Sequence, residues 1–408
     1  MKFLFIHQNF PAQYQHLILH LLDRGGHDIV FISEANDNAI PGVRRVLYKP
    51  EPGTPEYIHP AAQDLDRAVR RAEKVAAAAT NLKKLGFVPD IIIGHHGWGE
   101  LLNIPDVFPD VPLLGYFEFY YWSQGIDVNF DPEFPLDPAQ RPRIRAMNTV
   151  NHLAYGLGQA GQTPTEWQLS LYPEHMRPGI SLLTEGAQLD LCKPDPTART
   201  RPLTLGTFTV APQDTLVTYV ARNLEPYRGA HTMIRALPAL MRARPDLKVV
   251  MVGGDDVSYG ARCPTGSWRK HYLKEIAGKY DPARLLMPGQ VNYSTYLALL
   301  QRSDAHVYLT YPFVASWSLR EALAAGCAVV GADVDSVREF ITHGRNGLIT
   351  PCLDPGKLAD TVLALLEDRK LTAKLRTGAR RHAEKHLDMK LHLAAYAKRI
   401  HELTGQKI

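Results

Sequence analysis

The chain has 408 residues, enough for two or three domains of ~150 residues, and its 45% apolar and 22% charged residues are typical of a globular protein. A formal net charge of +4 is too small to favour nucleic-acid binding, and no apolar run approaches the ~20 residues of a transmembrane helix, so membrane contact would be peripheral. The four scattered cysteines lack the spacing of a metal site or a disulfide framework and predict reduced thiols in a cytoplasmic protein.

The first half of the chain alternates short apolar runs with helical patterns. The short N-terminal run is typical of a first strand and not of a signal peptide. A stretch with four prolines at 124–143 predicts a binding loop, a lid or a disordered segment. Strand–helix alternation indicates a parallel sheet. The expected strands are 3–6, 28–32, 43–48, 90–94 and 112–117, and the expected helices are 12–24 and 61–85.

The second half repeats this alternation after a proline-rich segment at 194–202, which we predict to be a linker. A separate helix is expected at 390–403. We therefore predict an α/β protein with domains at 1–196 and 203–387, in which residues 388–408 pack back onto the first domain. The expected strands of the second domain are 215–221, 247–252, 284–287, 306–309, 328–330 and 347–350.

The helix that starts near Ser316 is the most informative segment. It follows the strand 306–309, and in open parallel sheets ligands bind at the carboxyl ends of strands. Free amides at a helix N-terminus suit a phosphate group. Glu321, one turn into this helix, has two interpretations that stay open. It accepts hydrogen bonds from ribose hydroxyls, or it forms a capping box with Ser318.

Two arginines follow the strand 215–221. Arg222 and Arg228 carry guanidinium groups whose geometry matches phosphate oxygens, although most arginines are simply solvated surface charges. Gly254 follows the strand 247–252, where glycine allows close approach of a ligand to the backbone but is also common in turns. Both segments are candidates for a phosphate-binding edge.

These segments together resemble the donor domain of retaining glycosyltransferases of family 4 (glycosyl transferases group 1), which have the GT-B fold. The resemblance covers most of 215–385, and the N-terminal half is similar in layout and more loosely in motif. It implies two Rossmann-like domains that face a central cleft, the first on the acceptor side and the second binding a nucleotide-sugar. The matching segments are Arg222…Arg228-Gly229, Gly253-Gly254, Pro288-Gly289-Gln290-Val291, Glu321-Ala322-Leu323-Ala324-Ala325-Gly326 and Glu339…Gly344-Arg345-Asn346-Gly347.

The resemblance implies roles for individual residues. Arg222 and Arg228 would hold the donor diphosphate and act in catalysis, and Glu321 would bind the ribose. The family usually has lysine where Arg228 stands. It commonly has a sugar-facing glutamate where this chain has Phe313. The remaining donor-binding candidates are Gly254, the base-facing Gln290 and Val291, the phosphate-facing amides of Ser316, Trp317 and Ser318, and Leu319.

The implied reaction is transfer of a hexose from a nucleoside-diphosphate sugar to a hydroxyl, with retention of configuration. It would need neither metal nor cofactor. The acceptor, a glycan or a small molecule, is not readable from the sequence, and polysaccharide biosynthesis is the family-level expectation. The rival hypotheses are a nucleotide-sugar epimerase on the same fold and a nucleotide-sugar-binding protein without catalysis.

The candidate acceptor side lies at predicted strand ends of the first half. Glu118, among aromatic residues, either serves as a general base towards the acceptor or forms a salt bridge with Arg143 or Arg145. The resemblance adds that relatives usually place a histidine near this position. Adjacent histidines suggest a metal, but no third ligand is evident, so a sugar-facing loop is preferred. The acceptor-side candidates are Asn9, Gln13, Tyr14, His95, His96 and Trp98, with Phe313 from the second half.

The expected helix 61–85 has a basic character. Two interpretations stay open: a solvated face, which is the commoner one, or contact with an anionic membrane surface. The chain is therefore expected in the cytoplasm, with peripheral contact at the inner face of the membrane as the alternative. The basic residues are Arg67, Arg70, Arg71, Lys74, Lys83 and Lys84.

Overall fold

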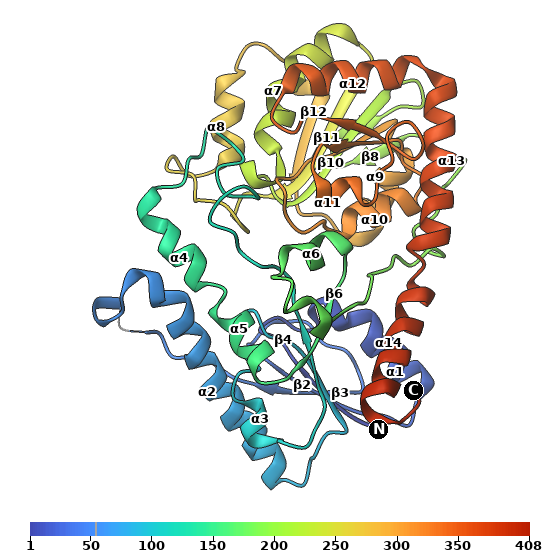
Figure 1. Ribbon diagram of the computed structural model, residues 1–408. Helices are drawn as coiled ribbons and strands as arrows, with labels where there is room; N and C mark the ends of the chain where they lie inside the picture. Colours follow the sequence, from blue (N-terminus) through green and yellow to red (C-terminus); the bar gives the residue numbers. More distant parts are fainter. Residues whose placement is uncertain (54) are drawn as a thin grey trace. The chain divides into compact units, whose positions relative to one another are not determined.

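A computed structural model describes residues 1–53 and 55–408. By its internal contacts the chain divides into two compact units, each described here by itself. The first unit is Met1–Glu185 with Lys390–Ile408, and the second is Gly186–Met389 (Figure 1). The contacts thus divide the chain at 185/186, whereas the sequence places the linker at 194–202.

The first unit is built on a seven-stranded parallel sheet with the order β3-β2-β1-β4-β5-β6-β7. The order reverses between β1 and β4, and ligands bind beside such a reversal in open α/β sheets. The strands are β1 (Lys2–Ile6), β2 (Asp28–Ser33), β3 (Val43–Leu47), β4 (Ile91–His95), β5 (Leu113–Tyr116), β6 (Ala160–Thr163) and β7 (Ile180–Leu182).

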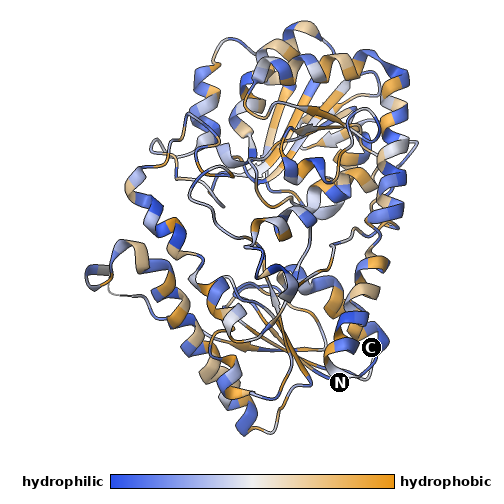
Figure 2. Ribbon diagram, viewed as in Figure 1, coloured by the Kyte–Doolittle hydropathy of each residue, from blue (hydrophilic) through white to orange (hydrophobic). Residues whose placement is uncertain are grey.

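The helices of this unit bury an apolar stripe and expose their charges. In α2 (Gln63–Lys84), the buried residues recur every three or four positions, which is the spacing of one helix face. Figure 2 shows apolar residues along the strands and alternating hydropathy along the helices. The other helices are α1 (Gln15–Arg24), α3 (Ile104–Val107), α4 (Arg141–Ala146), α5 (Thr149–Gly156), α6 (Glu166–Leu171) and α14 (Met389–Thr404).

The basic residues of α2 are largely paired. Arg70 bonds to Asp66 at 2.8 Å and Arg71 bonds to Glu34 at 3.3 Å. Lys83 donates to the carbonyl of Val107. The positive face expected from the sequence is therefore partly neutralised. The remaining pairs are Arg67–Asp64 and Lys74–Glu51.

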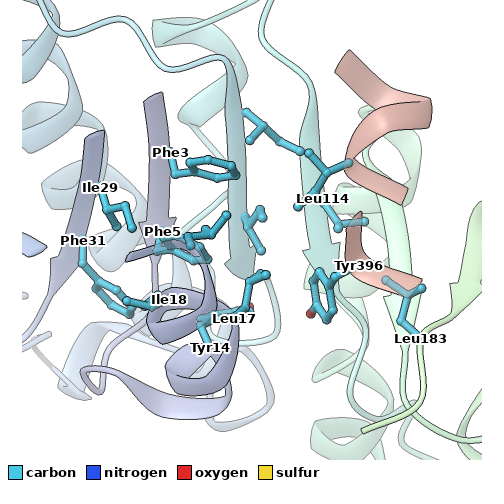
Figure 3. Close-up of a cluster of buried hydrophobic side chains, with 14 of the residues drawn as sticks. Phe3, Phe5, Tyr14, Leu17, Ile18, Ile29, Phe31, Leu114, Leu183 and Tyr396 are labelled. Carbon is cyan, nitrogen blue, oxygen red and sulfur yellow. The ribbon is translucent and has the colours of Figure 1, made fainter. Parts of the chain in front are cut away.

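Aromatic and aliphatic side chains fill one face of the first sheet. The tail helix α14 contributes Tyr396 and Ile400 to this cluster, so the chain's end is part of the first unit's core. Figure 3 shows Tyr396 beside Leu114 and Leu183. The other labelled members are Phe3, Phe5, Tyr14, Leu17, Ile18, Ile29 and Phe31.

The second unit is built on a six-stranded parallel sheet with the order β12-β11-β10-β13-β14-β15. Its order reverses between β10 and β13, as in a Rossmann sheet. A two-stranded antiparallel sheet pairs β8 with β9. The strands are β8 (Leu203–Leu205), β9 (Phe208–Val210), β10 (Thr215–Asn223), β11 (Leu247–Gly254), β12 (Leu285–Gly289), β13 (Ala305–Tyr308), β14 (Val329–Ala332) and β15 (Leu348–Thr350).

Helices connect the strands of the second sheet and place their N-termini after the strand ends. They are α7 (Ala230–Ala243), α8 (Trp268–Glu275), α9 (Tyr293–Arg302), α10 (Trp317–Ala324), α11 (Asp335–Arg338), α12 (Pro355–Glu367) and α13 (Arg369–His386). The short 3-10 helices of the chain are η1 (Ala12–Tyr14), η2 (Pro55–Tyr57), η3 (Pro60–Ala62), η4 (Pro138–Gln140), η5 (Arg177–Gly179), η6 (Pro226–Arg228) and η7 (Pro282–Arg284).

The described residues hold no helix long and apolar enough to span a membrane. The proline-containing stretch 124–143 has turns and bends up to η4, followed by the start of α4.

Candidate functional site

Two loops of the second unit meet at Arg228, beside the point where the strand order reverses. Arg228 ends η6, which follows β10, and its Nη1 atom donates to Thr310 Oγ1 and to the carbonyl of Val314, both at 3.0 Å. Thr310 and Val314 belong to the loop that follows β13. The guanidinium therefore joins the carboxyl ends of the two central strands.

The charge of Arg228 is buried without an ion pair in the part of the chain that the structure describes. Arg228 is only 6% exposed. Its guanidinium lies 4.8 Å from the ring centre of Tyr259 and 5.8 Å from that of Phe313, which are cation–π distances. Burying a cation without a paired anion is costly. Burial disfavours this charge, whereas the neighbouring Tyr308, Tyr259 and Glu225 raise the pKa of Arg228. An anionic ligand at this edge would supply a directly paired anion.

Gly229 permits this arrangement. Its φ of 70° lies in the left-handed region, and a Cβ there would overlap the side chain of Leu309. The turn before α7 can therefore approach the end of β13 only with glycine at this position.

Glu225 fixes a third loop beside Arg228. This fully buried carboxylate accepts backbone N–H bonds from Ser258, Tyr259 and Gly260 at 3.0, 3.2 and 3.0 Å. The loop after β11 is thereby held with the Tyr259 ring near Arg228. The sequence analysis missed Glu225 and Tyr259. The sequence did contain one indication of Glu225, which is an acidic residue shortly after a strand that ends at the candidate site.

We expect Glu225→Gln to lower the free energy of unfolding by about 2 kcal/mol, because an amide group leaves buried N–H donors without a charged acceptor. Denaturant unfolding measures this loss, and hydrogen exchange should quicken at residues 258–260. Glu275→Gln is the control, since Glu275 pairs with Arg235 at the surface and such pairs contribute about 0–1 kcal/mol. Equal effects of both substitutions would contradict the anchoring role.

Glu321 lies on α10 and contacts the hydroxyls of two tyrosines on α9. Its Oε1 accepts from Tyr293 at 2.9 Å and its Oε2 accepts from Tyr296 at 2.8 Å. The N-cap of α10 is Ser316, not Ser318, so the capping-box interpretation of Glu321 is wrong. The tyrosine pair was not predicted, because Tyr293 and Tyr296 lie on another helix, 28 and 25 residues before Glu321.

The environment of Glu321 keeps its carboxylate ordered. Burial raises its pKa, and the hydrogen bonds from the tyrosines and the Cys192 thiol oppose this shift. Burial also raises the pKa of Cys192 to about 11, so this residue stays a thiol. Tyr293 is 45% exposed, so one side of the carboxylate borders solvent. A carboxylate with ordered oxygens is suited to accept two neighbouring hydroxyls.

At the start of α10, two backbone N–H groups donate hydrogen bonds within the protein. The Ser316 N–H donates to Tyr308 Oη at 2.7 Å, and the Leu319 N–H donates to the Ser316 carbonyl at 3.2 Å. The Leu319 side chain is fully buried and belongs to the core. Both amides thus have intramolecular acceptors in this structure, and of these two only the Ser316 amide was expected to meet a phosphate. A phosphate role for Trp317 and Ser318, both half-buried, stays a prediction.

The other predicted residues of the second unit lie around this edge. Arg222 is exposed at the end of β10, and Gly254 is half-buried at the end of β11. Gln290 is exposed after β12, while Val291 packs against an apolar cluster. Phe313 is 6% exposed and packs against Tyr227 and Tyr259 at ring distances of 5.2 and 4.8 Å. Phe313 is thus part of an aromatic wall around Arg228, not an open acceptor contact.

The carboxyl edge of the first sheet brings His95 and Glu118 together. The Nδ1 atom of His95 accepts the Gly97 N–H at 3.1 Å, so Nε2 carries the proton of the neutral ring. Nε2 lies 3.4 Å from Glu118 Oε2. The predicted arginine partner is wrong for Arg143, which binds Asp64 at 2.7 Å.

This histidine–carboxylate pair borders open space. The Glu118 side chain is 38% exposed. Trp98 is 40% exposed, and its ring stacks on His95 with a centre distance of 6.2 Å. His7, at the end of β1, meets His95 edge-on at 5.4 Å and was not among the predicted site residues. A small hollow is lined by His95, Gly97, Trp98, Glu118, Phe119, Tyr121, Val150 and Asn151.

Two of the other predicted acceptor-side residues, His96 and Tyr14, have structural contacts instead. His96 is fully buried, and its Nε2 lies 2.7 Å from Asn151 Oδ1, so it does not face a sugar. Tyr14 is 1% exposed and belongs to the hydrophobic core. Gln13 is half-buried, with its amide nitrogen enclosed. Asn9 is exposed, and its backbone N–H donates to His7 Nδ1 at 2.8 Å.

We expect His96 to make stability fall in acid. Burial lowers its pKa to about 3, so below its ordinary pKa of about 6.5 the unfolded chain binds a proton that the folded chain does not. The loss should approach about 1.4 kcal/mol per pH unit between pH 6 and pH 4. Denaturant unfolding of His96→Gln should show a flatter pH dependence than that of the parent. An unchanged slope would contradict this assignment.

Comparisons with known proteins identify the family. Residues 25–192 match the family model described as glycosyl transferase family 4 group, and residues 208–382 match the model described as glycosyl transferases group 1. A phosphatidyl-myo-inositol mannosyltransferase of Mycolicibacterium smegmatis is 31% identical over 161 residues, 38% of this chain and 37% of the relative. The chain spans less than half the length of the curated relatives it matches.

Solved structures share the fold over nearly the whole chain. A sucrose-phosphate synthase from Thermosynechococcus elongatus has a TM-score of 0.71 at 17% identity, with 99% of both chains covered. HepE of Anabaena, solved with UDP-glucose, has a TM-score of 0.69 at 18% identity, with 99% of this chain and 100% of that chain covered. The chain therefore belongs to the glycosyl transferases group 1, and its two parallel-sheet α/β units have the GT-B fold.

Proposed function

We propose that this protein transfers a hexose from a nucleoside-diphosphate sugar to an acceptor hydroxyl, with retention of configuration and without a metal. The observation that carries the proposal is Arg228, a buried guanidinium without an ion pair in the described chain, beside the strand reversal of the second sheet. A diphosphate would provide its anion, and Arg228 would stabilise the diphosphate as it leaves.

We assign the nucleoside end of the donor to Glu321. Its carboxylate, held by Tyr293 and Tyr296, would accept the two ribose hydroxyls. Arg222, exposed at the end of β10, would reach the phosphates from solvent. A structural relative solved with UDP-glucose supports this donor class.

The acceptor is assigned to the first unit. Glu118, whose Oε2 lies 3.4 Å from His95 Nε2, would accept hydrogen bonds from acceptor hydroxyls and take the proton of the attacking one. Trp98 would stack on a sugar ring. The glycan or small molecule that binds here is left open, and the hollow beside the pair is where it would lie.

The test is a transfer assay with labelled nucleotide sugars and a panel of acceptors. We expect the labelled sugar to move to an acceptor, with its anomeric configuration unchanged in the product NMR spectrum and its rate unchanged by a chelator. Inversion, or a strict need for a divalent cation, would contradict the corresponding part of the proposal. Rearrangement of the donor in the absence of an acceptor would indicate an epimerase. Binding without transfer would indicate a non-catalytic protein, the alternative that rests on Phe313, an aromatic residue packed against Tyr259 where the family commonly has a glutamate.

A further inference from the structure

A second basic feature of the chain lies outside the site described above. A groove of about 770 Å³ runs between α13 and the loop 342–346 of the second unit. Six of the described residues that line the groove are basic, and none of the described lining residues is acidic. The basic residues are Arg345, Lys374, Arg381, His382, Lys385 and His386.

The four arginines and lysines of the groove form no ion pairs within residues 1–53 and 55–408. Elsewhere the same helix behaves differently. Arg380 pairs with Glu384 and donates to the Cys192 and Ala324 carbonyls, and Arg376 donates to the Ser303 carbonyl. α13 is therefore fixed by its other face, and the groove face keeps its positive charge for a ligand.

The groove is built into the fold, since its wall depends on a glycine. A Cβ at Gly378 would overlap the carbonyl of Arg345, so the loop packs directly on the helix backbone there. Four arginines and lysines and no acid among the described lining residues make the potential inside positive. Burial, and then the neighbouring His386 and Lys385, lower the pKa of His382 to about 4, so this ring is neutral.

The spacing of the cations indicates an extended ligand. Lys374, Arg381 and Lys385 follow one another at intervals of seven and four residues along one face of α13. The first and last are about 16 Å apart along the helix axis. A single phosphate cannot reach both ends, whereas a chain with regularly placed negative charges can contact every cation.

We propose that this groove binds a linear acidic polysaccharide. The choice of a glycan rests on the proposed function, while the charge and length requirements rest on the groove itself. Its lining offers no Phe, Tyr or Trp ring on which a nucleic-acid base would stack, and no large apolar side chain that would enter a bilayer. The hydroxyls of Thr342 and Thr377 lie among the cations and suit a hydroxyl-rich chain.

The test measures binding of fluorescently labelled alginate oligosaccharides to the full chain, with neutral dextran, oligo-dT and phosphatidylglycerol vesicles as comparison ligands. Arg381→Ala with Lys385→Ala should weaken alginate binding by about fivefold per cation. The matched control is Arg369→Ala with Lys370→Ala, which removes two exposed charges from the same helix outside the groove. It should change binding less than about twofold.

Several outcomes would overturn the proposal. They are no alginate binding above that of dextran, equal losses in both double variants, or preferential binding of oligo-dT or vesicles through the same residues. Thermal melting of each variant establishes that it is folded. Nucleoside-diphosphate binding should be unchanged in both variants, so failure of this proposal is distinguishable from failure of the proposed transferase function.

Discussion

Replacing Arg228 with methionine is expected to lower the transfer rate by about 10²–10³-fold while leaving the protein as stable as before. The rate loss is the size found when one preorganised donor to a developing negative charge is removed. Stability should change by less than about 1.5 kcal/mol, because the loss of the hydrogen bonds to Thr310 and Val314 is offset by the removal of a buried charge that has no ion pair. Transfer kinetics and denaturant unfolding measure the two effects.

The control for this prediction is Arg228→Lys. Lysine keeps the positive charge, and the family usually has lysine at this position, so most of the transfer activity should remain. If methionine unfolds the protein, Arg228 is structural, and its two hydrogen bonds to Thr310 and Val314 account for its burial. If methionine leaves transfer unchanged, Arg228 does not hold the diphosphate.

Replacing Glu321 with glutamine is expected to remove discrimination between ribose and 2′-deoxyribose in the bound nucleotide. A hydrogen bond to a charged group contributes about 1.5–3 kcal/mol, so the substitution should weaken the ribonucleoside diphosphate by about 10–100-fold. The 2′-deoxy analogue should lose much less. Isothermal titration of the two nucleotides against the parent and the variant gives all four affinities.

Tyr296→Phe is the matched control for Glu321→Gln. It removes one hydroxyl that orders the carboxylate at 2.8 Å but keeps the charge, so its effect should be smaller and should retain part of the ribose preference. If Glu321→Gln keeps the parent's ratio of ribo to deoxy affinity, the carboxylate does not contact the ribose.

Most of the strands that the sequence predicts, such as β1, β4 and β11, have continuous apolar runs. These runs are buried in the middle of a parallel sheet, so hydrophobicity alone marks them. β6 was missed because its sequence, Ala-Gly-Gln-Thr, contains no such run. β7, β8 and β9 were missed because each has only three residues and a polar residue separates its two apolar ones. Brevity and the lack of a continuous apolar run hid these strands.

At the candidate site, the sequence predicts which residues follow strand ends but not which atoms they meet. The adjacent His95 and His96 are equivalent by type, yet one approaches Glu118 and the other binds Asn151 inside the fold. Glu321 fits a local capping pattern, but its contacts come from Tyr293 and Tyr296, on a different helix. Partners distant in sequence decide these roles, and no local pattern encodes them.

The most direct test of the diphosphate assignment compares the affinities of UDP, UMP and uridine in equilibrium titrations. GDP, GMP and guanosine replace them if the guanine nucleotides raise the thermal stability of the protein more. The account predicts that the nucleoside diphosphate binds far more tightly than the monophosphate, and that Arg228→Met abolishes this difference. Equal affinities of the diphosphate and the monophosphate for the parent protein would contradict it.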